Sequence, residues 1–179
     1  MPPGRKDHTQ LRPLHLVRHP SHPGPPAAAL SAPRIIAVGS PFGTDRLGWE
    51  VAEWLRSGHL LTLAPPPEIL CCDRPGPRLL ELLSGVNLAF ILDAMSAGLA
   101  PGTVRCLNTD ELDGEDVRFS SHGFGLVSTL ALGRALRMLP PRLHVLGIEG
   151  GEGTMPDVRS AAESAARLIM ALADGRRAG

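Results

Sequence analysis

Aromatic side chains are scarce in this sequence. Phe and Trp make up 3% of the 179 residues, and there is no Tyr. Proteins that bind single-stranded nucleic acid usually stack the bases on aromatic side chains. The charges also balance, with 18 Lys and Arg against 18 Asp and Glu, so the chain has no basic surplus for a phosphate backbone. We therefore expect no nucleic-acid partner.

Long apolar runs and a regular cysteine pattern are also missing. No stretch approaches the roughly 18 to 20 apolar residues of a membrane span, and the first 20 residues lack the apolar run of a signal peptide. Cys71, Cys72 and Cys106 are an odd number, and two are adjacent, which gives neither a disulfide framework nor a CxxC site. We expect a cytoplasmic protein without a membrane partner, whose thiols are reduced and mostly buried.

The composition changes near residue 33. Residues 1–33 hold 8 of the 18 prolines and 4 of the 7 histidines, without helical or strand periodicity. This pattern predicts a disordered Pro/His-rich extension. Its imidazoles could bind a metal transiently, and the bland alternatives are a solvated tail or a start codon placed too far upstream. Residues 34–179 carry nearly all large apolar side chains and are predicted to form one folded domain.

Short apolar runs alternate with amphipathic stretches after residue 34. Residues 35–39 are typical of a buried parallel strand, and the apolar spacing from Leu47 predicts a helix that stops near Gly58. Further strands are expected at 60–63 or 68–72, 86–92, 103–107 and 143–148, and further helices at 78–83, 123–139 and 158–173. The alternation predicts a three-layer α/β/α fold with an open, mostly parallel twisted sheet.

Candidate functional residues follow the apolar runs, because ligands in such folds bind outside the carboxyl ends of the strands. Asp45 follows the first strand, Asp93 follows the run 89–92, and His122 precedes the helix predicted from residue 123. Two carboxylates and an imidazole suit a divalent ion such as Ni, Zn, Mn or Fe. Each residue could instead be structural: Asp45 or His122 as a helix cap, and Asp93 as a turn residue.

Three segments together resemble the signature blocks of the [NiFe]-hydrogenase maturation proteases. They are 35–48 (IIAVGSPFGTDRLG), 91–103 (ILDAMSAGLAPGT) and 120–126 (SSHGFGL), in the order of the family. These proteases are endopeptidases that trim the C-terminus of the hydrogenase large subunit. The resemblance implies an aspartic-type endopeptidase with a phosphorylase/hydrolase-like fold, acting as a monomer on a large-subunit precursor.

The resemblance also implies roles for the three candidate residues. Asp45, Asp93 and His122 would bind nickel that is already held by the precursor, so that nickel is recognised in the substrate and is not a permanent cofactor. Sharing the ion would fix the scissile peptide nearby and make cleavage depend on metal loading. Two mechanisms stay open: the metal could activate the peptide or a water, or a carboxylate could act as the general base.

The sequence departs from the family in two places. Ser40 stands where the family usually has Asn, and Asp45 is a single acid where the family often has two. The usual Asp-Gly-Gly-Thr block is present only as 73–76 (DRPG), which leaves Asp73 as a second candidate that could bind or orient the substrate. These departures keep open an alternative, a nickel or large-subunit chaperone that binds without cleaving.

Other functional interpretations lack their motifs. No GxGxxG or GxxxxGK[ST] follows a strand, as a nucleotide-binding domain would require, and HExxH and GxSxG are absent. Cys71 and Cys72 could be nucleophiles or soft ligands but are expected to be core thiols. Structural roles are also expected for His59, His144, Trp49 and Trp54, with one alternative: an exposed Trp on the first helix could be a docking surface for the precursor.

Overall fold

A computed structural model describes residues 31–57, 61–107, 118–119, 123–151 and 156–176. Three subjects of the sequence analysis lie outside these ranges: His122, His59 and nearly all of the extension 1–33. The proposed division of the chain at residue 33 therefore stays a prediction.

Strands and helices alternate along the described chain, as the sequence indicated. The strands are β1 (Arg34–Val38), β2 (Glu68–Cys72), β3 (Leu88–Ser96), β4 (Val104–Leu107), β5 (Arg118–Phe119) and β6 (Arg142–Glu149). The helices are the 3-10 turn η1 (Gly43–Arg46), α1 (Leu47–Ser57), α2 (Pro77–Leu83), α4 (Gly123–Ala135) and α5 (Val158–Ala173).

The strands form one sheet in the order β2-β1-β3-β6-β4. β2, β1, β3 and β6 are parallel, β4 pairs with β6 in the antiparallel direction, and the short β5 pairs antiparallel with the end of β3. The mostly parallel sheet is confirmed. The antiparallel edge strand was not predicted, because a short apolar run carries no information about its direction.

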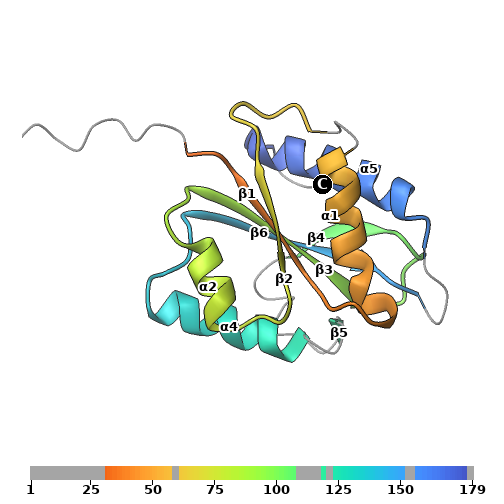
Figure 1. The fold of residues 1–179 in the computed structure, drawn as a ribbon, viewed down its shortest axis with the longest axis horizontal. Helices are drawn as coiled ribbons and strands as arrows, with labels where there is room; N and C mark the ends of the chain where they lie inside the picture. Colours follow the sequence, from red (N-terminus) through yellow and green to blue (C-terminus); the bar gives the residue numbers. More distant parts are fainter. Residues whose placement is uncertain (1–30, 58–60, 108–117, 120–122, 152–155, 177–179) are drawn as a thin grey trace, which may run out of the picture.

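Helices cover both faces of the sheet, which confirms the three-layer α/β/α architecture (Figure 1). α1 and α5 pack on one face and contact each other, whereas α2 and α4 pack on the other. Alternate residues of β3 supply the two cores: Phe90 and Leu92 face α1 and α5, and Ala89 and Ile91 belong to the core with α2 and α4.

Three predicted boundaries need correction. The strand predicted to end before Asp93 continues to Ser96, so Asp93 lies inside β3. The helix predicted to reach residue 139 ends at Ala135, where Arg137 takes a left-handed φ of 56° and the amide of Met138 donates to the carbonyl of Gly133 at 2.9 Å. Of the two alternatives for the second strand, 68–72 is the one that forms, because these residues pair with β1 along their whole length.

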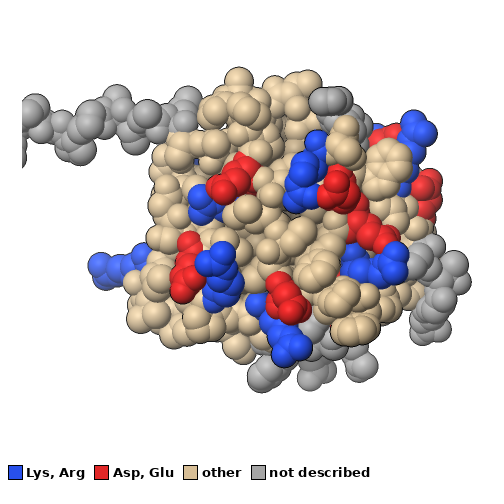
Figure 2. Space-filling view, in the orientation of Figure 1, with Lys and Arg blue, Asp and Glu red and all other residues tan. Residues whose placement is uncertain are grey.

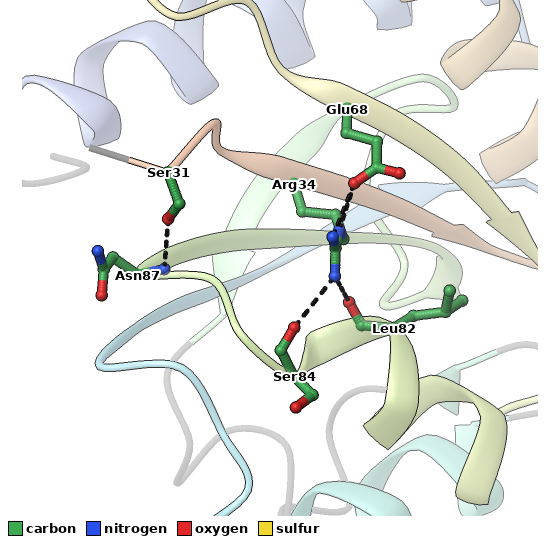
Figure 3. Close-up of polar contacts among 6 residues, drawn as sticks. All are labelled: Ser31, Arg34, Glu68, Leu82, Ser84 and Asn87. Atoms are coloured by element: carbon green, nitrogen blue, oxygen red, sulfur yellow. Dashed lines mark hydrogen bonds and ion pairs between the residues drawn. The ribbon is translucent and has the colours of Figure 1, made fainter. Parts of the chain in front are cut away.

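Arg34 joins three elements at the amino ends of the parallel strands (Figure 3). Its Nε donates to Glu68 Oε2 at 2.8 Å, and its Nη1 donates to the carbonyl oxygens of Leu82 and Ser84 at 2.6 and 3.2 Å. The Leu82 carbonyl belongs to the last turn of α2, where carbonyl groups lack helical partners. One guanidinium therefore connects β1, β2 and the end of α2.

Acidic and basic side chains alternate over the face shown in Figure 2, and several meet as ion pairs. No large patch of one sign is visible among the described residues on that face, in line with the balanced composition. Within the described ranges, no helix is long and apolar enough to cross a membrane.

Candidate active site

The first part of the candidate site is the connection from β1 to α1. η1 starts at Gly43 with Phe42 as its N-cap residue, so Asp45 lies within the helical turn and is not a cap. The hydroxyl of the buried Ser40 donates to Asp45 Oδ2 at 3.3 Å, and the amide of Ser40 donates to the carbonyl of Asp45 at the same distance. Ser40, noted in the sequence only as a departure from the family, thus orients the candidate carboxylate.

Two glycines bring this turn down onto the sheet. A Cβ atom on Gly39 would collide with the carbonyl oxygen of Asp45, and one on Gly48 would lie 2.7 Å from the carbonyl oxygen of Val38 and 3.2 Å from that of Leu92. The start of α1 therefore packs against β3 one residue before Asp93. Asp45 precedes Gly48 by three residues, about one helical turn.

Asp93 is completely buried in the central strand β3. It lies opposite Gly147 of β6, and strand alternation places it on the same face as Ile91 and Met95, the face covered by α2 and α4. Burying a carboxyl group in an apolar sheet costs free energy. Because Asp93 lies inside β3, it is not a turn residue, and its burial marks it as a functional candidate.

Asp73 follows the last residue of β2 and is well exposed, with its carboxylate 3.9 Å from the guanidinium of Arg74. The next residues reach α4: a Cβ on Gly125 would lie 3.0 Å from Cγ of Pro75. Arg74 also has a φ of 94°, which is strained for a residue with a side chain. The loop that carries Asp73 is therefore held against the beginning of α4.

His122 lies outside the described residues, but both neighbouring elements are described. Phe119 of β5 pairs with Met95, two residues beyond Asp93, and α4 begins at Gly123. The chain thus passes the end of β3 shortly before residue 122. Within the described ranges, no group of three or more His, Cys, Asp and Glu side chains could hold a metal ion. The combined set of Asp45, Asp93 and His122 stays a prediction.

The sheet order explains why these segments gather at one edge. From β1 the chain leads outward through α1 to β2, then crosses through α2 to β3 on the other side of β1. In folds of this kind the loops that leave the two strands at the reversal diverge, and ligands bind outside the carboxyl ends of those strands. Asp45 follows β1 and Asp93 lies in the carboxyl half of β3, so both candidates flank the switch point.

His144 and Trp49 have contacts that are typical of packing residues. The ring of His144 stacks on Phe90 with a centroid distance of 5.4 Å, and its pKa is lowered by burial and by Arg142. Both tryptophans belong to α1: Trp49 packs against the core, whereas Trp54 is 41% exposed. These positions favour packing roles for His144 and Trp49.

The cysteines are less buried than expected. Only Cys72 is buried, Cys106 is partly buried and Cys71 is exposed; none of the three forms a disulfide. Burial is the main cause that raises the pKa of Cys72, and its Sγ donates to the carbonyl of Arg74 at 3.3 Å. Because a raised pKa disfavours the thiolate, Cys72 is poorly suited to be a nucleophile.

An α/β fold with carboxylates at its switch point defines a class of ligand-binding domains and enzymes. Comparison with protein families is more specific: residues 75–173 match the HycI family, described as hydrogenase maturation protease. This match spans more than half of the chain. The chain belongs to the hydrogenase maturation protease family and is a peptidase, a hydrolase. The matched segment includes Asp93 and His122 but not Asp45 or Asp73.

Individual relatives agree with this assignment. The chain is 28% identical over 121 residues to a putative hydrogenase maturation protease of Methanocaldococcus jannaschii, covering 66% of this chain and 75% of the relative. Its fold is similar to that of the [NiFe] hydrogenase maturation protease HybD from Thermococcus kodakarensis, with a TM-score of 0.62, 23% identity and coverage of 79% and 99% of the two chains. The solution structure of an endopeptidase from Escherichia coli gives a TM-score of 0.63, 21% identity and coverage of 80% and 93%.

Proposed function

We propose that the chain removes the C-terminal extension of a nickel-loaded [NiFe]-hydrogenase large-subunit precursor, and that Asp45, Asp93 and His122 recognise the nickel of the precursor. The observation that carries this proposal is the placement of Asp93. Its carboxyl group is fully buried in a chain of the maturation protease family, and the start of α1, just after Asp45, packs against the preceding residue Leu92.

Carboxylate and imidazole groups match the ligand preferences of a divalent ion of intermediate softness. Such a set binds an ion weakly by itself, but an ion that is also held by the precursor adds ligands from the other side. The shared ion then fixes the neighbouring peptide, which lowers the entropic part of the barrier. In this proposal nickel belongs to the substrate, and the chain contributes the side chains that recognise the ion.

Asp45 is the better general base of the two carboxylates, because it is only partly buried and its Oδ2 is oriented by the Ser40 hydroxyl. Deprotonation of an attacking water requires access to that water. Asp93, in contrast, is completely buried, which suits a metal ligand better than a base that must reach a water. A cytoplasmic location and a monomeric state stay predictions.

A cleavage assay tests the proposal. Purified chain is mixed with nickel-loaded or nickel-free precursor, and loss of the C-terminal peptide is followed by mass spectrometry. We expect trimming of the nickel-loaded form only, abolished in Asp93→Asn and His122→Ala. Asp174→Asn is the matched control, since Asp174 is exposed at the end of α5 and pairs with Arg176.

Two outcomes would contradict the proposal. Nickel-dependent binding without trimming would establish the chaperone alternative. Trimming of nickel-free precursor at the same rate as nickel-loaded precursor would show that cleavage does not depend on recognition of the metal. Circular dichroism of Asp93→Asn separates loss of activity from loss of fold.

A further inference from the structure

A second buried carboxylate lies at the same edge of the sheet and has no part in the chemistry above. Glu149 is the last residue of β6, and only 2% of its surface is exposed. It lies opposite Met95 in the sheet, two residues beyond Asp93. A buried acid at a strand end needs hydrogen-bond partners to offset the cost of leaving water.

The partners of Glu149 lie in the turn that follows β3. Its Oε2 accepts hydrogen bonds from the amides of Ala97 and Leu99 at 2.8 and 3.3 Å. Its backbone amide donates to the carbonyl of Thr103 at 2.9 Å, and its carbonyl accepts from the amide of Gly102 at 2.8 Å. One residue thus holds both ends of the turn 97–103.

The residue after Glu149 extends this contact toward both candidate carboxylates. The amide of Gly150 donates to the carbonyl of Met95 at 2.9 Å, which fixes the end of β3. A Cβ on Gly150 would lie 3.5 Å from Cβ of Thr44, the residue before Asp45. The segment 149–150 therefore touches the end of β3 beyond Asp93 on one side and the Asp45 turn on the other.

We propose that Glu149 is a positioning residue for the processing reaction. Its carboxylate anchors the turn after β3 and thereby keeps the strand end that carries Asp93 in register with the turn that carries Asp45. This inference rests on the proposed function. Residues that orient ligating or reacting groups typically change affinity or rate by roughly 10- to 100-fold when they are removed.

The test compares Glu149→Ala and Glu149→Gln with Glu163→Ala as the matched control. Glu163 is on α5, and its side chain is 40% exposed and pairs with Arg159. For Glu149→Ala we expect kcat for nickel-loaded precursor to fall by about 10- to 100-fold with KM changed by less than about 2-fold, because binding groups stay while their alignment is lost.

Glu149→Gln separates positioning from a direct chemical role. The amide oxygen of Gln can accept both backbone bonds, so this variant should recover most of the lost kcat. Wild-type kcat in Glu149→Ala would overturn the proposal. A Gln variant that folds as stably as wild type but is as slow as the Ala variant would also overturn it, since the negative charge itself would then be required.

Amide hydrogen exchange distinguishes failure of this inference from failure of the proposed function. If the wild-type chain trims no precursor, the proposed function is wrong, and exchange decides the anchoring role alone. We expect the amides of Ala97 and Leu99 to exchange at least about 10-fold faster in Glu149→Ala, with the amides of β1 unchanged. Unchanged exchange at Ala97 and Leu99 would overturn the anchoring role.

Discussion

Replacing Gly39 with alanine is expected to displace Asp45 without altering any side chain of the candidate site. The new Cβ would lie closer than 3.0 Å to the carbonyl oxygen of Asp45 and 3.3 Å from Cδ1 of Trp49. Ordinary carbon contacts are about 3.5 to 4.0 Å. Because a backbone oxygen cannot rotate away, the Asp45 turn must move by roughly 1 Å, which also stretches the bond from the Ser40 amide.

The expected cost follows from this overlap. Forcing a methyl group into a packed contact costs about 1 to 3 kcal/mol of unfolding free energy. For a chain of this size each kcal/mol lowers Tm by about 2 to 4 °C, so the melting temperature should fall by roughly 2 to 12 °C. A shift of about 1 Å in a reacting group can reduce a rate by about 100-fold. Urea unfolding and the precursor assay measure the two effects separately.

Gly85→Ala is the matched control for this experiment. Gly85 has a φ of 78°, and a Cβ added there would have no described atom within 4 Å, so alanine at this position is strained without a collision. The left-handed conformation costs about 1 to 2 kcal/mol, and the position lies between α2 and β3, away from Asp45. Equal loss of processing in both variants, or wild-type stability in Gly39→Ala, would refute the reasoning.

Three further predictions concern positions away from that turn. Arg34→Met should lower the unfolding free energy by about 1.5 to 3 kcal/mol in urea titrations, because Glu68 and the carbonyl oxygens of Leu82 and Ser84 lose a charged hydrogen-bond donor; no change would show that these bonds are offset by desolvation. His144 has a pKa below its ordinary 6.5, so the unfolded chain binds this proton more readily. The unfolding free energy should therefore fall as the pH drops from 6.5 toward the folded-state pKa, and it should stay constant above 6.5. His144→Phe should remove this pH dependence from the urea midpoints measured between about pH 5 and 8. An unchanged pH dependence would show that other groups cause it. Iodoacetamide should modify the exposed Cys71 before Cys72, whose thiol is buried and has a raised pKa, as read by peptide mass spectrometry; equal rates would indicate local opening of β2.

The order of strands and helices could be predicted from the sequence because each apolar run is short and bounded by glycine or polar residues. The prediction for α5 is correct to the residue, since its alanine-rich apolar stripe begins directly after its cap Asp157. The predicted end of β3 is too early because a carboxyl group usually marks the end of a buried apolar run. In the structure the sheet continues past Asp93 because β6 pairs with it through Gly147 and on to Glu149.

The sequence pattern located part of the candidate site and missed its supporting contacts. Asp45 and Asp93 became candidates because polar residues that follow apolar runs are simple to recognise, and their roles stay predictions. Glu149 ends the apolar run 143–148 in the same manner, and the same criterion could have found it. The Ser40 contact could not be found, because it depends on how η1 folds back over Gly39. His122 stays a prediction.

The contacts of Ser31 and of the end of α5 have a practical consequence for immobilisation. Ser31 accepts a hydrogen bond from the amide of Asn87, just before β3, and Arg142, the first residue of β6, donates to the carbonyls of Leu172 and Ala173 at the end of α5. Both attachment points are therefore at the amino ends of the parallel strands. Asp93 is five residues along β3 from Leu88, about 17 Å away at 3.3 Å per residue.

A resin, sensor surface or fused carrier joined at Ser31 or at the end of α5 would consequently lie at the edge of the sheet opposite the candidate site. A bulky folded precursor could then reach it without competing with the support. This geometry favours surface-based kinetics of precursor capture and release with attachment at either of these two positions, and it predicts the same association rate for both orientations.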